Sequence, residues 1–138
     1  MEQYTRDNMA SLLRQHEINP THQRIEIAFA IFSRQKHLSA DQIMAIVNER
    51  HSETSKATVY NTLNLFLQQK LIRQVIVDPS KVFYDPNTSE HHHFYDIVTG
   101  QITDIDASSI TLKGLPALPH GTVTEGVDII VRTRPSAA

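Results

Sequence analysis

Hydrophobic residues in the first third of the chain recur at the spacing of α-helices. Met9, Leu12 and Leu13 predict a first helix that ends near the Asn19-Pro20 step, because a residue before proline is pushed out of the α region. A second helix is predicted to start there, with Pro20 in its first turn. Its apolar stripe consists of Ile25, Ala28, Phe29 and Phe32.

Two further helices are predicted before residue 70. The stretch from Ser39 to Gln42, S-A-D-Q, has the pattern of a capping box and predicts a helix with Ile43, Ile46 and Val47 facing inward. In SKATVYNTLNLFLQQK, Ser55 is the expected N-cap. The buried stripe of this fourth helix is Val59, Leu63, Phe66 and Leu67. Its other face is polar but weakly charged, which is typical of a DNA recognition helix and equally of an ordinary solvated surface; it carries Lys56, Tyr60, Asn61, Asn64 and Gln68.

The pattern then changes to that of β-strands. Two short strands are predicted in RQVIV and VFYD, joined by DPSK with a turn at Asp78-Pro79. Helices followed by such a hairpin predict a winged helix-turn-helix. FYDIV, Thr99-Gly100 and QITDI predict a second hairpin, and VDIIVRT predicts a last strand. The expected fold class is therefore α+β, with a winged helix-turn-helix over 1–86 and a small α/β domain over 87–138.

Composition and charge narrow the class of protein. The 138 residues are 40% hydrophobic, enough for a core, and contain no cysteine, which excludes disulfides, thiolate zinc sites and thiol redox chemistry. No leader-like segment and no apolar run of about 18 residues is present, so we expect a cytoplasmic protein without a membrane span. Residues 1–75 carry nine Lys or Arg against seven Asp or Glu, and the remainder carries four against eight. The balance suggests an N-terminal part that meets phosphate and a C-terminal part that meets cations.

Three adjacent histidines stand out in SEHHHFYDIVTG, which runs from Ser89 to Gly100. Histidine-rich tracts are a compositional sign of metal binding, although a chance triplet is conceivable in a chain with eight histidines. Side chains alternate along a strand, so His91 and His93 are expected to share one face, about 6 to 7 Å apart along the backbone, with His92 on the other.

Several motifs together resemble the ferric uptake regulator superfamily. They occur in that family's order: THQR at Thr21, HLSADQI at His37, KATVYNTL at Lys56, and the histidine triplet followed by a hairpin with Asp104. Within that superfamily the chain is most similar to the iron response regulator branch, whose members respond to haem and iron status. This similarity lies in TVYNTL, LIRQVIVDPSKVFYD, the histidine triplet and VDIIVRTR. The resemblance implies a homodimeric transcription factor on a palindromic operator. Residues 1–86 would bind DNA, and residues 87–138 would dimerise and sense metal or haem.

The resemblance also implies site residues. The metal ligands would be His37, Asp85, His91, His93 and Asp104, and a second metal or haem site would involve Glu90 and His92. Nitrogen and oxygen ligands without sulfur suit Fe(II), Mn(II) or Zn(II). In the DNA interface, Arg24 and Ser55 would anchor phosphate, and the major groove would be approached by Lys56, Thr58, Tyr60 and Asn61.

Departures from the family pattern leave alternatives open. The CxxC pairs of many relatives are absent, so neither a structural four-cysteine zinc site nor a cysteine-based haem motif is expected. The expected function is a metal- or haem-responsive regulator of iron homeostasis, and the sign of the response is open. The alternatives are a manganese-, zinc- or peroxide-responsive repressor and, from another class, a metal-dependent hydrolase built on the triplet. No motif supplies a catalytic base, so we expect no enzyme. Histidines expected to lie on the surface or in packing are His16, His22, His51 and His120.

Overall fold

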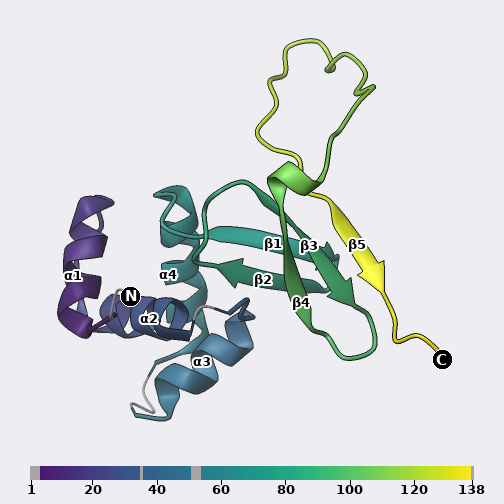
Figure 1. Ribbon diagram of the computed structural model, residues 1–138. Helices are drawn as coiled ribbons and strands as arrows, with labels where there is room; N and C mark the ends of the chain where they lie inside the picture. Colours follow the sequence, from purple (N-terminus) through teal and green to yellow (C-terminus); the bar gives the residue numbers. More distant parts are fainter. Residues whose placement is uncertain (1–3, 35, 51–53, 138) are drawn as a thin grey trace. The chain divides into compact units, whose positions relative to one another are not determined.

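The computed structural model describes residues 4–34, 36–50 and 54–137, and the chain forms two compact units, Met1–Thr88 and Ser89–Ala138. The division follows Thr88, whereas the sequence placed the boundary after residue 86. The N-terminal unit contains α1 (Arg6–Gln15), α2 (His22–Arg34), α3 (Ala40–Asn48), α4 (Lys56–Gln68), β1 (Arg73–Asp78) and β2 (Lys81–Asp85) (Figure 1). The C-terminal unit contains β3 (His91–Asp96), β4 (Ile102–Asp106), the 3-10 turn η1 (Ala107–Ser109) and β5 (Ile130–Thr133).

The first two helices begin and end at positions set by local hydrogen bonds rather than by Pro20. After α1, Glu17 adopts a left-handed φ of 60°, and the Ile18 N–H donates to the Leu13 carbonyl at 2.9 Å, which closes the helix in a Schellman motif. The predicted end near Asn19 was therefore too late. The Thr21 hydroxyl accepts from the Arg24 N–H at 3.3 Å, so α2 begins at His22 and Pro20 precedes its first turn.

The third and fourth helices begin where the sequence placed them. Ser39 and Gln42 form the predicted capping box, each side chain bonded to the other's backbone N–H. Ser55 is the N-cap of α4 and accepts from the Thr58 N–H at 3.1 Å. The helix ends with Lys70 at φ 59° and with Leu71 donating to the Phe66 carbonyl, the same motif that closes α1.

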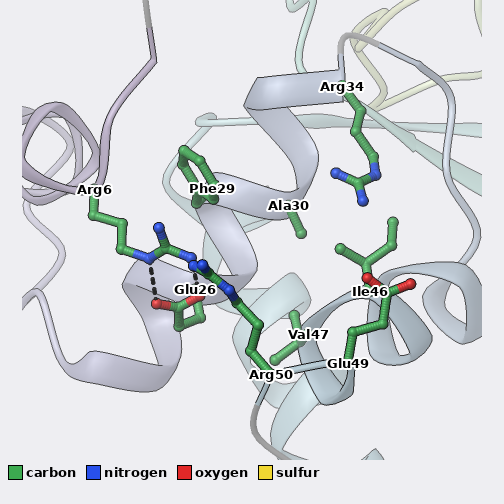
Figure 2. Close-up of a pocket in the computed structure, with 9 residues that line it drawn as sticks. All are labelled: Arg6, Glu26, Phe29, Ala30, Arg34, Ile46, Val47, Glu49 and Arg50. Atoms are coloured by element: carbon green, nitrogen blue, oxygen red, sulfur yellow. Dashed lines mark hydrogen bonds and ion pairs between the residues drawn. The ribbon is translucent and has the colours of Figure 1, made fainter.

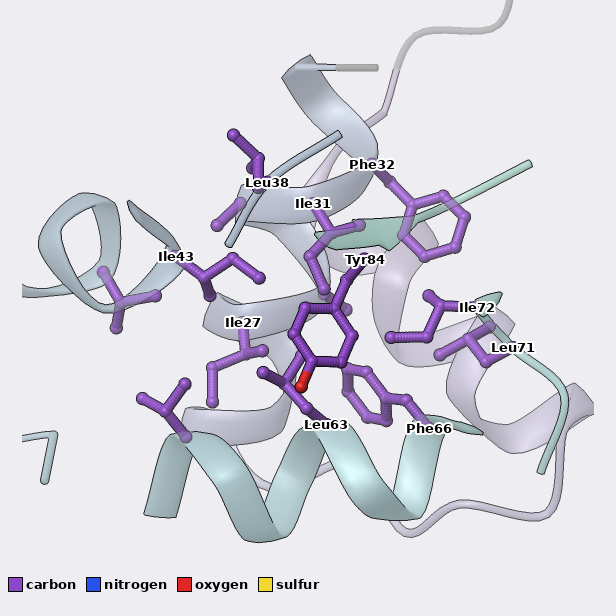
Figure 3. Close-up of a cluster of buried hydrophobic side chains, with 14 of the residues drawn as sticks. Ile27, Ile31, Phe32, Leu38, Ile43, Leu63, Phe66, Leu71, Ile72 and Tyr84 are labelled. Carbon is purple, nitrogen blue, oxygen red and sulfur yellow. The ribbon is translucent and has the colours of Figure 1, made fainter. Parts of the chain in front are cut away.

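The core of the N-terminal unit lies between the helices and the β1–β2 hairpin (Figure 3). The predicted inward residues Ile43, Val59, Leu63 and Phe66 are all buried, whereas Leu67 is only partly buried. Helix α2 contacts α1, α3 and α4 and is buried more widely than one stripe, because Ile27, Ala28, Ala30, Ile31 and Phe32 are all buried. The stripe predicted for α2 was therefore too narrow, and its members Ile25 and Phe29 are only partly buried.

Strands β1 and β2 form the predicted antiparallel wing. Its turn is held by Asp78, whose Oδ1 accepts from the Ser80 N–H at 2.8 Å and from the Ser80 hydroxyl at 2.7 Å. These bonds stabilise the carboxylate and lower the pKa of Asp78 from its ordinary value. An isolated antiparallel bridge joins Leu38, just before α3, to Tyr84 of β2. Four helices and a wing hairpin make the N-terminal unit a winged helix-turn-helix, as predicted.

In the C-terminal unit β3 is the central strand of a three-stranded sheet, antiparallel to β4 and parallel to β5. The predicted hairpin turns at Gly100, which has a φ of 76°, and Asp96 Oδ1 accepts from the N–H groups of Val98 and Thr99. These two bonds lower the pKa of Asp96. The connection from η1 to β5 is irregular and exposed, so η1 is the helical part of this unit over the described residues. No helix in the described part of the chain has the length and apolarity to cross a membrane.

Candidate metal centre and nucleic-acid interface

His37 and Asp85 form a pair within the N-terminal unit. The bridge between Leu38 and Tyr84 is antiparallel, so the residues on either side of it, His37 and Asp85, face each other. His37 Nε2 lies 3.1 Å from Asp85 Oδ2, and only 13% and 5% of the two side chains are exposed. Asp85 Oδ1 accepts from the Asn87 N–H at 2.9 Å, which fixes the carboxylate and directs Oδ2 at the imidazole. The pair presents one nitrogen and one oxygen donor at a fixed separation.

A second donor group lies on one face of the sheet in the C-terminal unit. In the β3–β4 register His93 is opposite Asp104, and His91 lies two residues before His93 on the same face. Nε2 of His91 and Nε2 of His93 lie 3.7 and 3.5 Å from Asp104 Oδ1, and the two ring centroids are 4.5 Å apart. Both imidazoles are buried, and Asp104 is about half exposed on its side chain at 47%. Three ligand atoms of the kinds that Fe(II), Mn(II) and Zn(II) accept therefore meet on this face.

The hydrogen bonding of His91 selects the ligand atom. Its Nδ1 lies 2.7 Å from the Ser89 carbonyl oxygen, which can only accept, so Nδ1 carries the proton and donates. The proton-free nitrogen is then Nε2, the atom that faces Asp104. A backbone partner on the far nitrogen is the usual way in which a protein orients a metal-binding imidazole. The donor set of this unit fits a divalent cation.

His92 points away from these two residues, as the alternation of the strand predicted. It is buried, and its Nδ1 accepts from the Ile129 N–H at 3.1 Å, just before β5. The bond fixes the neutral tautomer with the proton on Nε2. Glu90, the other residue expected in a second metal or haem site, is exposed just before β3. The structure therefore gives His92 a structural partner, which the sequence did not indicate because residue 129 is distant in the chain.

The surface of α4 and its N-cap carry most of the residues expected to meet DNA, and Arg24 lies on α2. Lys56, Tyr60 and Asn61 are exposed, and Lys56 Nζ lies 5.9 Å from the centroid of the Tyr60 ring. The hydroxyls of Thr58 and Ser55 are 2.9 Å apart, so both contribute to the N-terminal cap. Arg24 Nη1 donates to the Asn19 carbonyl at 3.0 Å, which holds the guanidinium near the start of α2. The exposed residues Lys56, Tyr60, Asn61 and Asn64 thus give α4 polar groups that can hydrogen-bond to base edges.

The remaining histidines have other environments. His16 Nδ1 lies 3.0 Å from the Leu12 carbonyl oxygen, and His22 and His120 are exposed, whereas His51 lies outside the described residues. Two partners of the candidate ligands were missed from the sequence. The Asn87 N–H on Asp85 follows the local D-P-N turn pattern and was detectable, because aspartate accepts from the backbone two residues on. The Ser89 carbonyl on His91 has no residue-type signal.

Known proteins share sequence features and the fold of this chain. The model of the "Ferric uptake regulator family" matches residues 15–125. The peroxide-responsive repressor PerR of Staphylococcus aureus (strain Mu50) is 31% identical over 104 residues, which are 75% of this chain and 70% of the repressor. The ferric uptake regulator from Pseudomonas aeruginosa with manganese has a TM-score of 0.69 at 21% identity, covering 92% of this chain and 97% of that chain. The ferric uptake regulator from Francisella tularensis with iron has a TM-score of 0.69 at 20% identity, covering 87% and 93%. The structural likeness establishes the fold.

Proposed function

This chain belongs to the ferric uptake regulator family, and from that premise we propose that it is a metal-responsive transcription regulator that binds a palindromic operator as a homodimer. The observation that carries the proposal is the pair of donor groups, one in each unit: His37 with Asp85, and His91 and His93 with Asp104. The family is one of regulators, which favours this proposal over the hydrolase alternative.

We propose that the two donor groups bind one divalent cation together. Each group alone offers two or three ligand atoms, fewer than the four to six that Zn(II), Fe(II) or Mn(II) usually take from protein and water. Together they offer three imidazoles and two carboxylates. When bound, the cation would supply the positive charge that holds the carboxylates of Asp85 and Asp104 to a common centre. Two solved relatives hold iron and manganese, respectively, which supports a metal of this class.

Binding across two units can control DNA binding through a population shift. A cation that contacts both groups favours arrangements in which they are close, and it shifts the equilibrium only by its difference in affinity between arrangements. The residue next to Asp85 is Tyr84, which packs in the core with Leu63 of α4 (Figure 3). Asp85 of the donor pair therefore directly follows a residue of the core that positions the proposed recognition helix. Lys56, Tyr60 and Asn61 would read the major groove, and Arg24 and Ser55 would contact phosphate.

The signal to which the regulator responds is a separate question from metal binding. A peroxide-responsive repressor is the second candidate, favoured by the 31% identity to the Staphylococcus aureus protein. A haem-responsive regulator of iron homeostasis remains our proposal for the iron response branch, with His92 and Glu90 as candidate ligands. The bond from Ile129 to His92 Nδ1 restricts this proposal, because His92 could bind haem iron only through Nε2 and would first have to lose the Nε2 proton.

The test is a titration of the full-length protein with Mn(II), Fe(II) and Zn(II), with operator binding followed by fluorescence anisotropy and mass by light scattering. The operator is first selected from random duplexes. Asp85→Asn and Asp104→Asn each remove one carboxylate from one donor group, and Glu125→Gln, at an exposed acidic residue outside both groups, is the matched control.

We expect operator binding by a dimer to depend on metal, and we expect Asp85→Asn and Asp104→Asn each to weaken metal affinity at least tenfold, with Glu125→Gln unchanged. Loss of metal response in only one of the two variants would show that the groups bind separate ions. Operator binding that ignores all three metals would reject metal control. Loss of operator binding when millimolar peroxide is added to the Fe(II)-loaded protein would favour the second candidate. Loss of operator binding on addition of haem would favour the haem proposal.

A further inference from the structure

A cavity of about 360 Å³ lies between α1, α2 and α3 in the N-terminal unit (Figure 2). None of its lining residues belongs to the donor groups or to the proposed DNA face. Volumes from about 300 Å³ upward are typical of small-molecule sites. The lining combines an apolar floor with charged side chains; it consists of Arg6, Glu26, Phe29, Ala30, Arg34, Ile46, Val47, Glu49 and Arg50.

One side of the cavity is rigid and electrically balanced. Arg6 Nε donates to Glu26 Oε1 at 2.6 Å and Arg6 Nη2 donates to Oε2 at 3.2 Å, a bidentate pair that spans α1 and α2. The Arg6 guanidinium also lies 4.5 Å from the centroid of the Phe29 ring. Glu26 is buried, and its hydrogen bond raises the pKa of Arg6 above its ordinary value. This pair neutralises itself and needs no further counter-ion.

The other charged residues leave an excess of positive charge. Arg34, at the end of α2, and Arg50, after α3, both line the cavity, and in Figure 2 Arg34 extends toward Ile46 while Arg50 extends toward Glu26. Over the described residues, neither guanidinium has a side-chain hydrogen bond or an ion pair. Glu49 is the single remaining acidic residue of the lining, so two guanidiniums face one carboxylate.

We propose that this cavity binds a small organic anion with a carboxylate or phosphate group and a short apolar part. Guanidinium groups bind both kinds of anion through paired N–H donors, and two of them from different helices can hold one doubly charged ligand. Phe29, Ala30, Ile46 and Val47 would cover the apolar part of the ligand. Because α2 and α3 both border the cavity and pack in the core with α4, the bound anion would stabilise the DNA-binding unit. The proposal does not rest on the metal site.

The experiment uses three probes on the full-length protein freed of metal: phenyl phosphate, succinate and inorganic phosphate. Binding is measured by calorimetry and by amide chemical shifts in α2 and α3. Arg34→Gln and Arg50→Gln are the test variants, and Arg14→Gln, at an exposed arginine of α1 outside the cavity, is the matched control for charge. The test residues are exposed, so the variants should fold, and circular dichroism checks that they do.

We expect phenyl phosphate to bind saturably with one site per chain and more tightly than inorganic phosphate, because only the former covers the apolar floor. Each test variant should bind it roughly tenfold more weakly, and Arg14→Gln should bind it like the parent. No saturable binding of any probe at millimolar concentration, or equal weakening in all three variants, would overturn the proposal. So would a lower operator affinity and a smaller salt slope in Arg34→Gln and Arg50→Gln with probe binding unchanged, since the arginines would then contact DNA phosphate. These outcomes are independent of metal response, and a protein that ignores metals could still bind the probe.

Discussion

Replacing each of two neighbouring histidines by asparagine should separate a metal ligand from a structural residue. Asparagine Oδ1 can occupy nearly the place of imidazole Nδ1, so His92→Asn keeps an acceptor for the Ile129 N–H, whereas His93→Asn removes the Nε2 that faces Asp104. We expect His92→Asn to retain the metal response of the parent and His93→Asn to lose most of it. The two variants differ by one position and by no other chemistry.

The size of the effect follows from linkage. Metal at 100 times its Kd stabilises the folded protein by about 2.7 kcal/mol, and a loss of one ligand that weakens binding about 100-fold reduces this to about 0.4 kcal/mol. His92→Ala, which leaves the Ile129 N–H without its acceptor, should cost about 1 to 3 kcal/mol without any metal. Of these three variants, we expect only His93→Asn to change the difference between metal-loaded and metal-free protein.

The assay is urea unfolding followed by tyrosine fluorescence, because Tyr95 is buried in β3 next to the site and the chain has no tryptophan. Each variant is unfolded with chelator and with saturating Mn(II). Equal loss of metal stabilisation in His92→Asn and His93→Asn would show that the triplet acts as one site and that the assignment of two faces is wrong. If His93→Asn kept the full metal stabilisation of about 2.7 kcal/mol, His93 would not be a metal ligand.

Three further predictions address the DNA face, a helix N-cap and a turn. Tyr60 is 39% exposed and contacts Lys56, so Tyr60→Ala should change the free energy of unfolding by no more than about 1 kcal/mol, the worth of an exposed cation–π contact. It should lower operator affinity by about 1 to 3 kcal/mol, and an unchanged ratio of operator to scrambled-duplex affinity would exclude base reading. Ser55→Ala should cost about 1 kcal/mol in urea unfolding through loss of the N-cap, whereas Ser55→Gly should cost only a few tenths, and equal costs would contradict a capping role. In the folded state Asp96 has a pKa below its ordinary 3.8, so its charge stabilises the fold above pH 3.8 and ceases to do so as the pH falls through the lowered pKa. The difference in free energy of unfolding between the parent and Asp96→Asn should therefore shrink on acidification. A difference that is independent of pH would reject this contribution.

Features set by nearby residues were predictable from the sequence. The capping box of Ser39 and Gln42 and the cap at Ser55 follow from residue types three positions apart, and both were placed correctly. The separation of His92 from its neighbours follows from strand alternation alone. The hairpin at Gly100 was also placed correctly, because a turn that needs a positive φ favours glycine.

Features set by distant backbone groups were not predictable. The end of α1 depends on the Ile18 N–H bonding to the Leu13 carbonyl with Glu17 in a left-handed conformation. The sequence did not indicate this conformation, because the residue at that position is not glycine. The pairing of Arg6 with Glu26 and the Ile129 bond to His92 join residues that are 20 and 37 positions apart. Charge and hydrophobicity patterns carry no information on which of many polar groups will meet across such distances.

In the proposed shared site, the division of donors between two units decides what a bound ion can do. An ion held by His37 and Asp85 alone, or by the imidazoles of β3 with Asp104 alone, has the same affinity whatever the arrangement of the units, and a ligand with equal affinity for two states shifts neither. To move an equilibrium from about 1:99 to 99:1, the affinities must differ by about 10⁴-fold, or roughly 5.5 kcal/mol. Only an ion whose ligand number changes with the arrangement can reach that difference. Under the proposed shared site, a response of operator binding to metal therefore requires donors from both units. Substitution of either aspartate should weaken the metal response at least tenfold even where the other donor group is intact.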